Sequence, residues 1–208
     1  MDKRSEQKAK TRIKLINAAL ELSSTKGFAA LSLREVAQAA EIAPTAFYRH
    51  FRDMEELGLS LVDEIAVSLR RLLRNARKNS EAKDLSSLTR FSIETFIEYV
   101  NENANLFRLL LGERQGASDT FRAALRKEID LFVVELSEDL DRLAVMQNQK
   151  LRHSGYAAEA IVTIVFTIGA EALDLPPFKQ EALKIRIVEE VNMILRGARE
   201  TSRVKTKR

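Results

Sequence analysis

The chain has 208 residues, of which 45% are hydrophobic, so it is long and apolar enough to bury a substantial core. It contains no cysteine and only two histidines, which excludes disulfides, thiolate metal sites and cysteine nucleophiles and leaves little material for a histidine-based triad or metal site. Residues 1–52 hold 10 Lys and Arg against 5 Asp and Glu, whereas the remainder holds 24 against 25, so a polyanion would bind near the N-terminus.

Apolar residues recur at spacings of three and four along nearly the whole chain, which has only seven glycines and three prolines. This periodicity predicts an all-α fold of about nine helices, with a helix-turn-helix domain at residues 1–52 and a ligand-binding and dimerisation domain at residues 53–208. The charged N-terminus lacks a signal-peptide pattern, and the apolar run 160–170 is shorter than the roughly 18 residues of a membrane span. We therefore expect a cytoplasmic protein with no membrane span, metal or cofactor.

The first predicted helix runs from about Ser5 to Thr25, and Gly27 is placed to end it. Its inward stripe is predicted to be Ile13, Ile16 and Leu20. Four basic residues occupy its start, namely Lys8, Lys10, Arg12 and Lys14. These either contact phosphates or form a solvated helix face.

A capping box, Ser32 with Glu35, predicts that a second helix begins at Leu33 and runs to Ala40. After the break at residues 41–43, Pro44 occupies the first position of a third helix, where its missing N–H costs nothing. Two short helices around a tight turn indicate a helix-turn-helix.

The third helix has two distinct faces. Phe47 and Phe51 are four residues apart and are predicted to bury together, whereas Thr45, Tyr48 and Arg49 share the opposite face. A threonine offers a hydroxyl and a methyl to base edges, a tyrosine donates to a phosphate, and an arginine suits a guanine or a phosphate. We therefore expect this outer face to enter the major groove.

A long fourth helix follows, capped by Asp53 with Glu56 three residues on. Its apolar stripe is predicted to comprise Leu57, Leu61, Ile65, Leu69 and Leu72. This helix connects the DNA-binding part with the helical body.

The string LSLREVAQAAEIAPTAFYRHFRDMEELGLSLVDE resembles the DNA-binding signature of the TetR family of repressors, over about residues 8 to 64. The resemblance implies that Arg34, Pro44, Thr45 and Tyr48 face the groove and that His50 contacts a phosphate. Together with the residue-based reasoning, the predicted DNA-binding set is Lys10, Arg12, Arg34, Pro44, Thr45, Tyr48, Arg49, His50 and Arg52.

Two positions depart from the family pattern. Glu41 stands where the turn usually holds glycine, and a non-glycine residue in a left-handed turn costs roughly 1 to 2 kcal/mol, so either the strain is tolerated or the turn differs. Met54 stands where the fourth helix often begins with a phosphate-binding lysine, and we hypothesise that Arg52 replaces that lysine.

Three further strings, FRLLLGERQGAS, FRAALRKEI and VTIVFTIGAEALD, extend the resemblance to the subgroup of fatty-acid biosynthesis repressors typified by FabR and DesT. The subgroup implies a repressor that binds a palindromic operator near genes for unsaturated fatty-acid biosynthesis. It further implies long-chain acyl-CoA or acyl carrier protein thioesters as effectors.

The body is predicted to contain helices at residues 85–102, 104–112, 119–146, 155–175 and 177–199. Apolar stripes for an acyl chain and arginines for a head group define the predicted ligand-binding set: Leu69, Phe107, Arg108, Leu111, Arg114, Phe121, Arg122, Leu125, Phe132 and Phe166. Core packing and surface solubility are the alternative explanations for these residues.

The last two helices are apolar over more than one face and are predicted to form a homodimer, which would place two recognition helices about one DNA turn (roughly 34 Å) apart. Three other functions stay open. Acidic pocket residues would favour a TetR-type regulator of another hydrophobic ligand, such as a drug. A helical acyl-thioester enzyme and a membrane-surface protein are the remaining alternatives.

Overall fold

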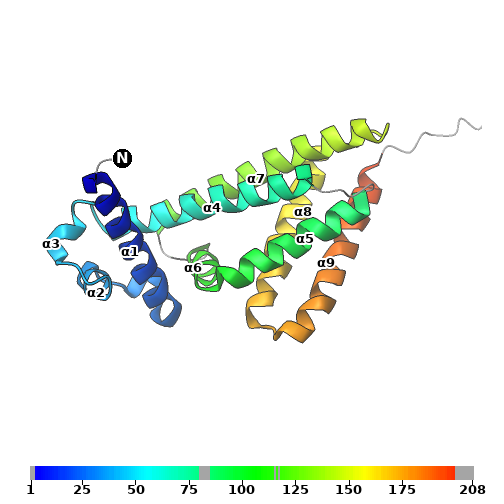
Figure 1. Ribbon diagram of the computed structural model, residues 1–208. Coiled ribbons are helices and arrows are strands. Elements are labelled where there is room, and N and C mark those ends of the chain that lie inside the picture. The colour runs from blue at the N-terminus through cyan, green and yellow to red at the C-terminus, as the bar shows by residue number, and fades with distance from the viewer. Residues whose placement is uncertain (1–2, 80–84, 115, 117, 200–208) are drawn as a thin grey trace, which may run out of the picture. The chain divides into compact units, whose positions relative to one another are not determined.

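The computed structural model describes residues 3–79, 85–114, 116 and 118–199 and confirms the all-helical prediction (Figure 1). Within these residues there are nine α-helices and two short 3₁₀ helices, and the only β-type pairing is a single bridge between Leu151 and Arg199. In chain order the elements are α1 (Lys3–Lys26), η1 (Phe28–Ala30), α2 (Leu33–Ala39), α3 (Pro44–Phe47), α4 (Met54–Asn79), α5 (Leu85–Glu102), α6 (Ala104–Arg114), α7 (Asp119–Met146), α8 (Ser154–Gly169), η2 (Ala170–Asp174) and α9 (Pro177–Ala198).

The described residues form two compact units. Unit 1 comprises the chain up to Ser68 together with Glu102–Glu128, and unit 2 comprises Leu69–Asn101 together with the chain from Ile129 onward. Helices α4 and α7 therefore each contribute residues to both units. The boundary predicted after residue 52, between a DNA-binding and a ligand-binding domain, stays a prediction.

The buried face of α1 is centred on Leu15 and Ala19, which are fully buried, with Ile16 and Ala18 beside them. The prediction for Ile13 is wrong, because this side chain is 55% exposed. At about 100° per residue, a position two residues before Leu15 points to the opposite side of the helix. In unit 1, α1 packs against α2 and α6.

Gly58 of α4 allows two aromatic rings to approach the helix backbone in unit 1. A Cβ at this position would lie 2.1 Å from Cζ of Phe121 and 2.8 Å from Cε1 of Phe28. The two rings pack with centroids 5.4 Å apart. The start of α7 thus belongs to the core that supports the N-terminal helices.

In unit 2, α8 packs along α9, and the ring of Phe96 from α5 fills the space that a side chain at Gly169 would need. The buried Gln180 of α9 accepts a hydrogen bond from Asn101 at 2.8 Å and donates to the carbonyl of Ala172 at 3.0 Å. The predicted stripe of the fourth helix holds as far as Leu69, but Leu72 is 37% exposed.

The helix predicted at residues 155–175 ends at Gly169 and continues as the 3₁₀ helix η2. The segment Ser154–Asp174 has the length and the mean hydropathy, 1.5, of a membrane-crossing helix, and 44% of it is buried in this fold. A single such segment is weak evidence for a span, because the core helix of a folded domain has the same composition.

Candidate DNA-binding surface and effector cavity

The recognition helix α3 is a single turn whose inner side is fixed by aromatic packing. Pro44 begins the helix as predicted, and Tyr48 ends it. Phe47 is fully buried, and its ring lies 5.7 Å from that of Phe51, which is 1% exposed. The prediction that these two phenylalanines bury together is confirmed.

The outer side of α3 presents the side chains predicted to face DNA. Thr45 and Arg49 are exposed, and Tyr48 is 65% exposed. The Tyr48 ring meets the buried Phe47 ring edge-on, with centroids 6.0 Å apart. A hydroxyl on α3, and a phenol and a guanidinium on the two residues that follow it, are therefore exposed beside the buried ring of Phe47. Arg34 on α2 and Pro44 are also exposed.

The turn between α2 and α3 contains a residue in the left-handed conformation, Glu41, at the position where the sequence left either a strained or a different turn open. Glu41 has φ 59°, its N–H donates to the carbonyl of Gln38 at 3.0 Å, and the N–H of Ile42 donates to that of Ala37 at 2.9 Å. This pair of bonds is the Schellman ending, which normally places glycine at the left-handed position. The turn is therefore left-handed at Glu41, and the strain at this residue is tolerated.

A capping network sets where α2 begins. The Ser32 hydroxyl accepts the N–H of Glu35, whose carboxylate in return accepts the N–H of Ser32, so the predicted capping box is present. Lys26 also donates to the Glu35 carboxylate. Hydrogen bonds from Lys26 and Ser32 lower the pKa of Glu35 to about 2. The carboxylate therefore stays charged, and it stabilises the first turn of α2.

His50 is half-buried, and its Nδ1 is a buried atom with no hydrogen-bond partner among the described residues. Burial lowers the pKa of His50, and the positive charges of Lys8, Arg12 and Arg49 lower it further. A proton on Nδ1 would be a buried donor without an acceptor, so the neutral tautomer that carries its proton on Nε2 is favoured. That N–H suits the phosphate contact that the resemblance implies.

Three basic residues of the predicted set have partners within unit 1. Arg12 lies over the Phe51 ring, 4.4 Å from its centroid, and reaches Glu64 at 3.4 Å. Lys10 pairs with Glu6 at 2.8 Å. Arg52 donates to Asp53 at 2.9 Å, and this contact raises the pKa of Arg52.

The start of α4 is capped in a variant of the predicted way. Asp53 accepts the N–H of Glu56 at 2.8 Å, but Glu56 accepts the N–H of Arg52, at 2.6 Å, rather than that of Asp53. The pKa of Asp53 is lowered, mainly by the hydrogen bond from the Glu56 N–H and next by the hydrogen bond from Arg52. Arg52 thus has a local structural role next to the position of the missing family lysine.

Unit 2 contains a mostly apolar cavity of about 100 Å³. Its wall is built by α4, α5, α7, α8 and α9 and comprises Arg70, Leu73, Arg77, Leu88, Thr89, Ser92, Ile93, Phe96, Phe132, Glu135, Leu136, Leu140, Leu143, Ile161, Val162, Val165, Phe166, Val191 and Leu195. Phe166 lies between two other rings of the wall, 5.3 Å from Phe96 and 5.1 Å from Phe132. The volume is smaller than the roughly 150 Å³ of an engineered cavity that admits benzene.

The charged residues of this wall belong to a cluster of ion pairs between α4 and α7. Glu135 pairs with Arg70 at 3.5 Å and with Arg74 at 2.7 Å. One turn along α7, Asp139 pairs with Arg77 at 2.6 Å and with Arg142. The lining residues among them are two arginines, Arg70 and Arg77, and one carboxylate, Glu135.

The structure brings together only part of the predicted ligand-binding set. Phe132 and Phe166 line the cavity, and Leu69 is buried in unit 2 but is not part of the wall. Seven residues lie in unit 1: Phe107, Arg108, Leu111, Arg114, Phe121, Arg122 and Leu125. Of these, Phe121 packs on Phe28, and Arg122 donates to the Gly116 carbonyl and to Asp119.

The sequence reasoning missed Arg70, Arg77 and Glu135 as wall residues. A usable signal was present, because Arg70, Arg74 and Arg77 recur at the spacing of one helix face and the carboxylates at 135 and 139 do the same. Opposite charges on two helices at this spacing predict a pairing between the helices.

A capped tight turn followed by a short exposed helix, with hydroxyl and basic groups outside and phenylalanines inside, is typical of a helix-turn-helix domain. Residues 15–61 match the family model described as bacterial regulatory proteins, tetR family. Over these residues the chain is similar to the regulatory proteins of the TetR family.

Solved structures share this fold across both units. A putative TetR-family regulator from Syntrophomonas wolfei is 16% identical, with a TM-score of 0.76 over 96% of this chain and 99% of that one. A TetR-family regulator from Streptomyces coelicolor is 18% identical, with a TM-score of 0.70 over 96% and 97%. The fatty acid degradation regulator FadR from Bacillus halodurans is 15% identical, with a TM-score of 0.68 over 92% and 97%.

Proposed function

We propose that this protein is a cytoplasmic homodimeric repressor of the TetR type that binds a palindromic operator and responds to long-chain acyl-CoA or acyl carrier protein thioesters. The genes it controls would be those of unsaturated fatty-acid biosynthesis, as the resemblance over most of the chain implies. The observation that carries the effector proposal is a mostly apolar cavity whose wall includes two arginines, Arg70 and Arg77, beside one carboxylate, Glu135.

Operator recognition is assigned to the outer face of α3. Thr45, Tyr48 and Arg49 are exposed next to a fully buried Phe47, so they are held in place yet free to meet base edges and phosphates. Arg34 supports them from α2. Lys10, Arg12, His50 and Arg52 would supply phosphate contacts around this face, with Arg12 and Arg52 exchanging a protein partner for a phosphate.

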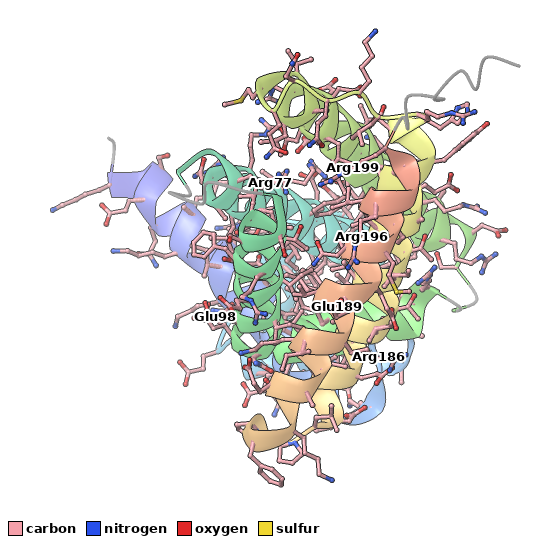
Figure 2. All side chains as sticks on the ribbon, turned by 90° about the vertical axis from the view of Figure 1, so that its right-hand side faces the viewer. Arg77, Glu98, Arg186, Glu189, Arg196 and Arg199 are labelled. Carbon is pink, nitrogen blue, oxygen red and sulfur yellow. The ribbon has the colours of Figure 1, made fainter. Side chains whose placement is uncertain are left out.

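The homodimer is assigned to α8 and α9. Large apolar side chains are exposed on both helices: Tyr156 on α8, and Phe178, Ile185 and Met193 on α9. Figure 2 shows Arg186, Glu189 and Arg196 along α9, where Arg186 pairs with Glu190 at 3.1 Å and Arg196 pairs with Glu189 at 3.5 Å. An exposed apolar surface with charged side chains beside it is typical of a protein interface.

The cavity supports a shift between two conformations as the mechanism. It is far smaller than the roughly 300 to 1,000 Å³ of ligand pockets, so a long acyl chain must enlarge it by separating helices of its wall. One of those helices, α4, also runs into unit 1. A conformation with an enlarged cavity would then differ in operator affinity.

A regulator of another hydrophobic ligand, such as an organic cation, is the second candidate. Glu135 in the cavity wall is the observation that favours it. Because Glu135 already pairs with Arg70 and Arg74, a cation would meet a cluster with excess positive charge. An apolar ligand with an oxygen acceptor fits this wall better.

The proposal is tested by selecting operator DNA from a random pool with the full-length protein and repeating the selection with palmitoyl-CoA. We expect a palindromic consensus whose binding changes with the thioester. Arg49→Ala should lower both affinity and its salt dependence, whereas Arg90→Ala, an equal loss of charge on an exposed residue of unit 2, should not. Selection of no palindrome, or identical binding with every acyl-CoA tried, would contradict the proposal.

A further inference from the structure

Arg12 of α1 contacts two other parts of unit 1 at once. Its guanidinium lies over the ring of Phe51, with Cζ 4.4 Å from the ring centroid, and its Nη2 donates to Oε1 of Glu64 on α4 at 3.4 Å. Phe51 is itself held in place, because it is buried and packs on Phe47 of the recognition helix. The attraction of a ring face for a cation does not depend on which acceptor the cation meets. The contact with Phe51 can therefore persist while Arg12 changes its polar partner.

The ion pair between Arg12 and Glu64 is weak. Its distance of 3.4 Å exceeds the roughly 2.7 to 2.9 Å of a strong hydrogen bond between a guanidinium and a carboxylate. The two side chains are 36% and 50% exposed, so water and salt screen the pair. Among the described residues, Glu64 is the only hydrogen-bond acceptor that Arg12 contacts. A stronger acceptor that approaches this surface can therefore take Arg12 from Glu64.

Arg12 also lies near the side chain that is predicted to contact a phosphate. Burial lowers the pKa of His50 most, and the positive charges of Lys8 and Arg12 lower it further. A charge has this effect only when it is close to the imidazole. The guanidinium of Arg12 is thus near both the Glu64 carboxylate and the predicted phosphate contact at His50.

We propose that Glu64 sets the DNA affinity of this protein by competing with a DNA phosphate for Arg12. The inference rests on the proposed function, because it needs α1 to meet the phosphates of an operator. A phosphate can accept two N–H groups of one guanidinium, whereas Glu64 accepts one. DNA therefore displaces Glu64, but the lost ion pair reduces the affinity. Glu64 is a positioning residue that acts through Arg12 and keeps DNA binding weaker than the basic residues alone would make it.

The experiment is a double-mutant cycle with the full-length protein. Fluorescence anisotropy measures its affinity for the operator recovered from the random pool and for a duplex of mixed sequence. Glu64→Gln keeps the shape of the side chain but removes its charge, and it should tighten binding to both duplexes about two- to fivefold, the range of an exposed ion pair. Arg12→Gln should weaken binding to both and reduce the salt slope by about one. In the Arg12→Gln background, Glu64→Gln should no longer tighten binding.

Asp63→Asn is the matched control, because Asp63 is the exposed neighbour of Glu64 on α4 and loses the same charge. A general repulsion between α4 and DNA would be relieved equally by both substitutions and would be relieved without Arg12 as well. Competition for Arg12 requires both Arg12 and Glu64. Thermal unfolding of the same variants separates an effect on stability from the effect on DNA affinity.

The two duplexes separate this inference from the proposed function. If the cycle holds with the mixed-sequence duplex while the selection yields no palindrome, the repressor proposal fails and the competition for Arg12 stands. If Glu64→Gln leaves both affinities unchanged, tightens binding equally without Arg12, or is matched by Asp63→Asn, the inference is overturned even where the operator is as proposed. A protein that binds neither duplex would overturn both.

Discussion

The rings of Phe28 and Phe121 meet at the backbone of Gly58, each within 3 Å of the place where a Cβ would stand. Their centroids are 5.4 Å apart. This contact joins the connection after α1 with the beginning of α7, two segments that are far apart in the sequence.

Gly58→Ala should therefore lower the free energy of unfolding by about 1 to 3 kcal/mol, because a methyl group would overlap Cζ of Phe121. Denaturant unfolding measures the change. Gly112→Ala is the matched control, since nothing lies within 4 Å of a Cβ there, and it should stabilise α6 by up to about 1 kcal/mol through helix propensity. Equal effects of the two substitutions would rule out the packing explanation.

Glu41→Gly should raise the free energy of unfolding by about 1 kcal/mol, because φ 59° is strained for a side chain with a Cβ and suits glycine. The ion pair with Lys14, at 3.7 Å between exposed groups, contributes little that would be lost. Glu41→Val, with a branched side chain in the same conformation, should be destabilising. A valine variant as stable as the glycine variant would argue against the left-handed turn.

Tyr48→Phe should leave stability within about 0.5 kcal/mol of the parent, because the side chain is 65% exposed. Its operator affinity should fall by about 1 to 2 kcal/mol, the contribution of one hydrogen bond to a phosphate. Phe47→Ala, one residue earlier, should instead cost about 3 to 5 kcal/mol of stability. Fluorescence anisotropy with operator DNA and thermal unfolding measure the two effects separately.

Operator affinity should increase as the pH falls toward the lowered pKa that His50 has in the free protein. Burial lowers the pKa of His50 in the free protein below the ordinary value of 6.5, so the imidazole stays neutral to a lower pH than a free histidine does. A bound phosphate would raise the pKa of His50, so binding takes up a proton and lower pH favours the complex. His50→Gln should reduce this part of the pH dependence. An unchanged pH profile in the glutamine variant would remove His50 from the phosphate contacts.

The fold itself has the opposite dependence on this group. Because the pKa of His50 is lower in the folded than in the unfolded chain, the stability that its neutral form contributes is complete above about pH 6.5 and is lost as pH falls through the folded value. Unfolding measurements across the same pH range therefore separate the two effects.

Asp139→Ala should cost about 3 kcal/mol, because it leaves Arg77, only 14% exposed at its side chain, beside the cavity without this carboxylate. Replacing both partners, Asp139→Leu with Arg77→Met, should recover most of that loss. Comparing the single and double variants by denaturant unfolding measures the coupling between them.

The N-terminal part was predictable because its signals are local. A capping box at Ser32, a proline at the start of α3 and two phenylalanines four residues apart each depend on neighbours a few residues away. The same locality explains why the bounds of α5 and α7 were predicted to the residue. Ile13 was assigned wrongly because two helical stripes that differ by one residue fit the apolar pattern of α1 almost equally well.

The cavity could not be predicted in the same way. Its wall combines residues from five helices, and the periodicity of one helix does not reveal which neighbour its apolar face meets. Phe107 and Phe132 both belong to apolar stripes, yet they lie in different units. The contact between α4 and α7 was predictable only from their charged residues. The arginines of α4 pair with carboxylates of α7, whereas the apolar stripes do not show which helices meet.

The part played by Phe121 in unit 1 has a consequence for dissecting this protein. A fragment that stops at residue 52 or at the end of α4 would lack α6 and the beginning of α7, and with them the ring that covers Phe28 and Gly58. Such a fragment would expose apolar surface and should not fold autonomously. Chimaeras that exchange the N-terminal helices between regulators would therefore need to include residues 102–128 as well. The DNA-binding specificity of this protein could be transferred only as a discontinuous piece of chain.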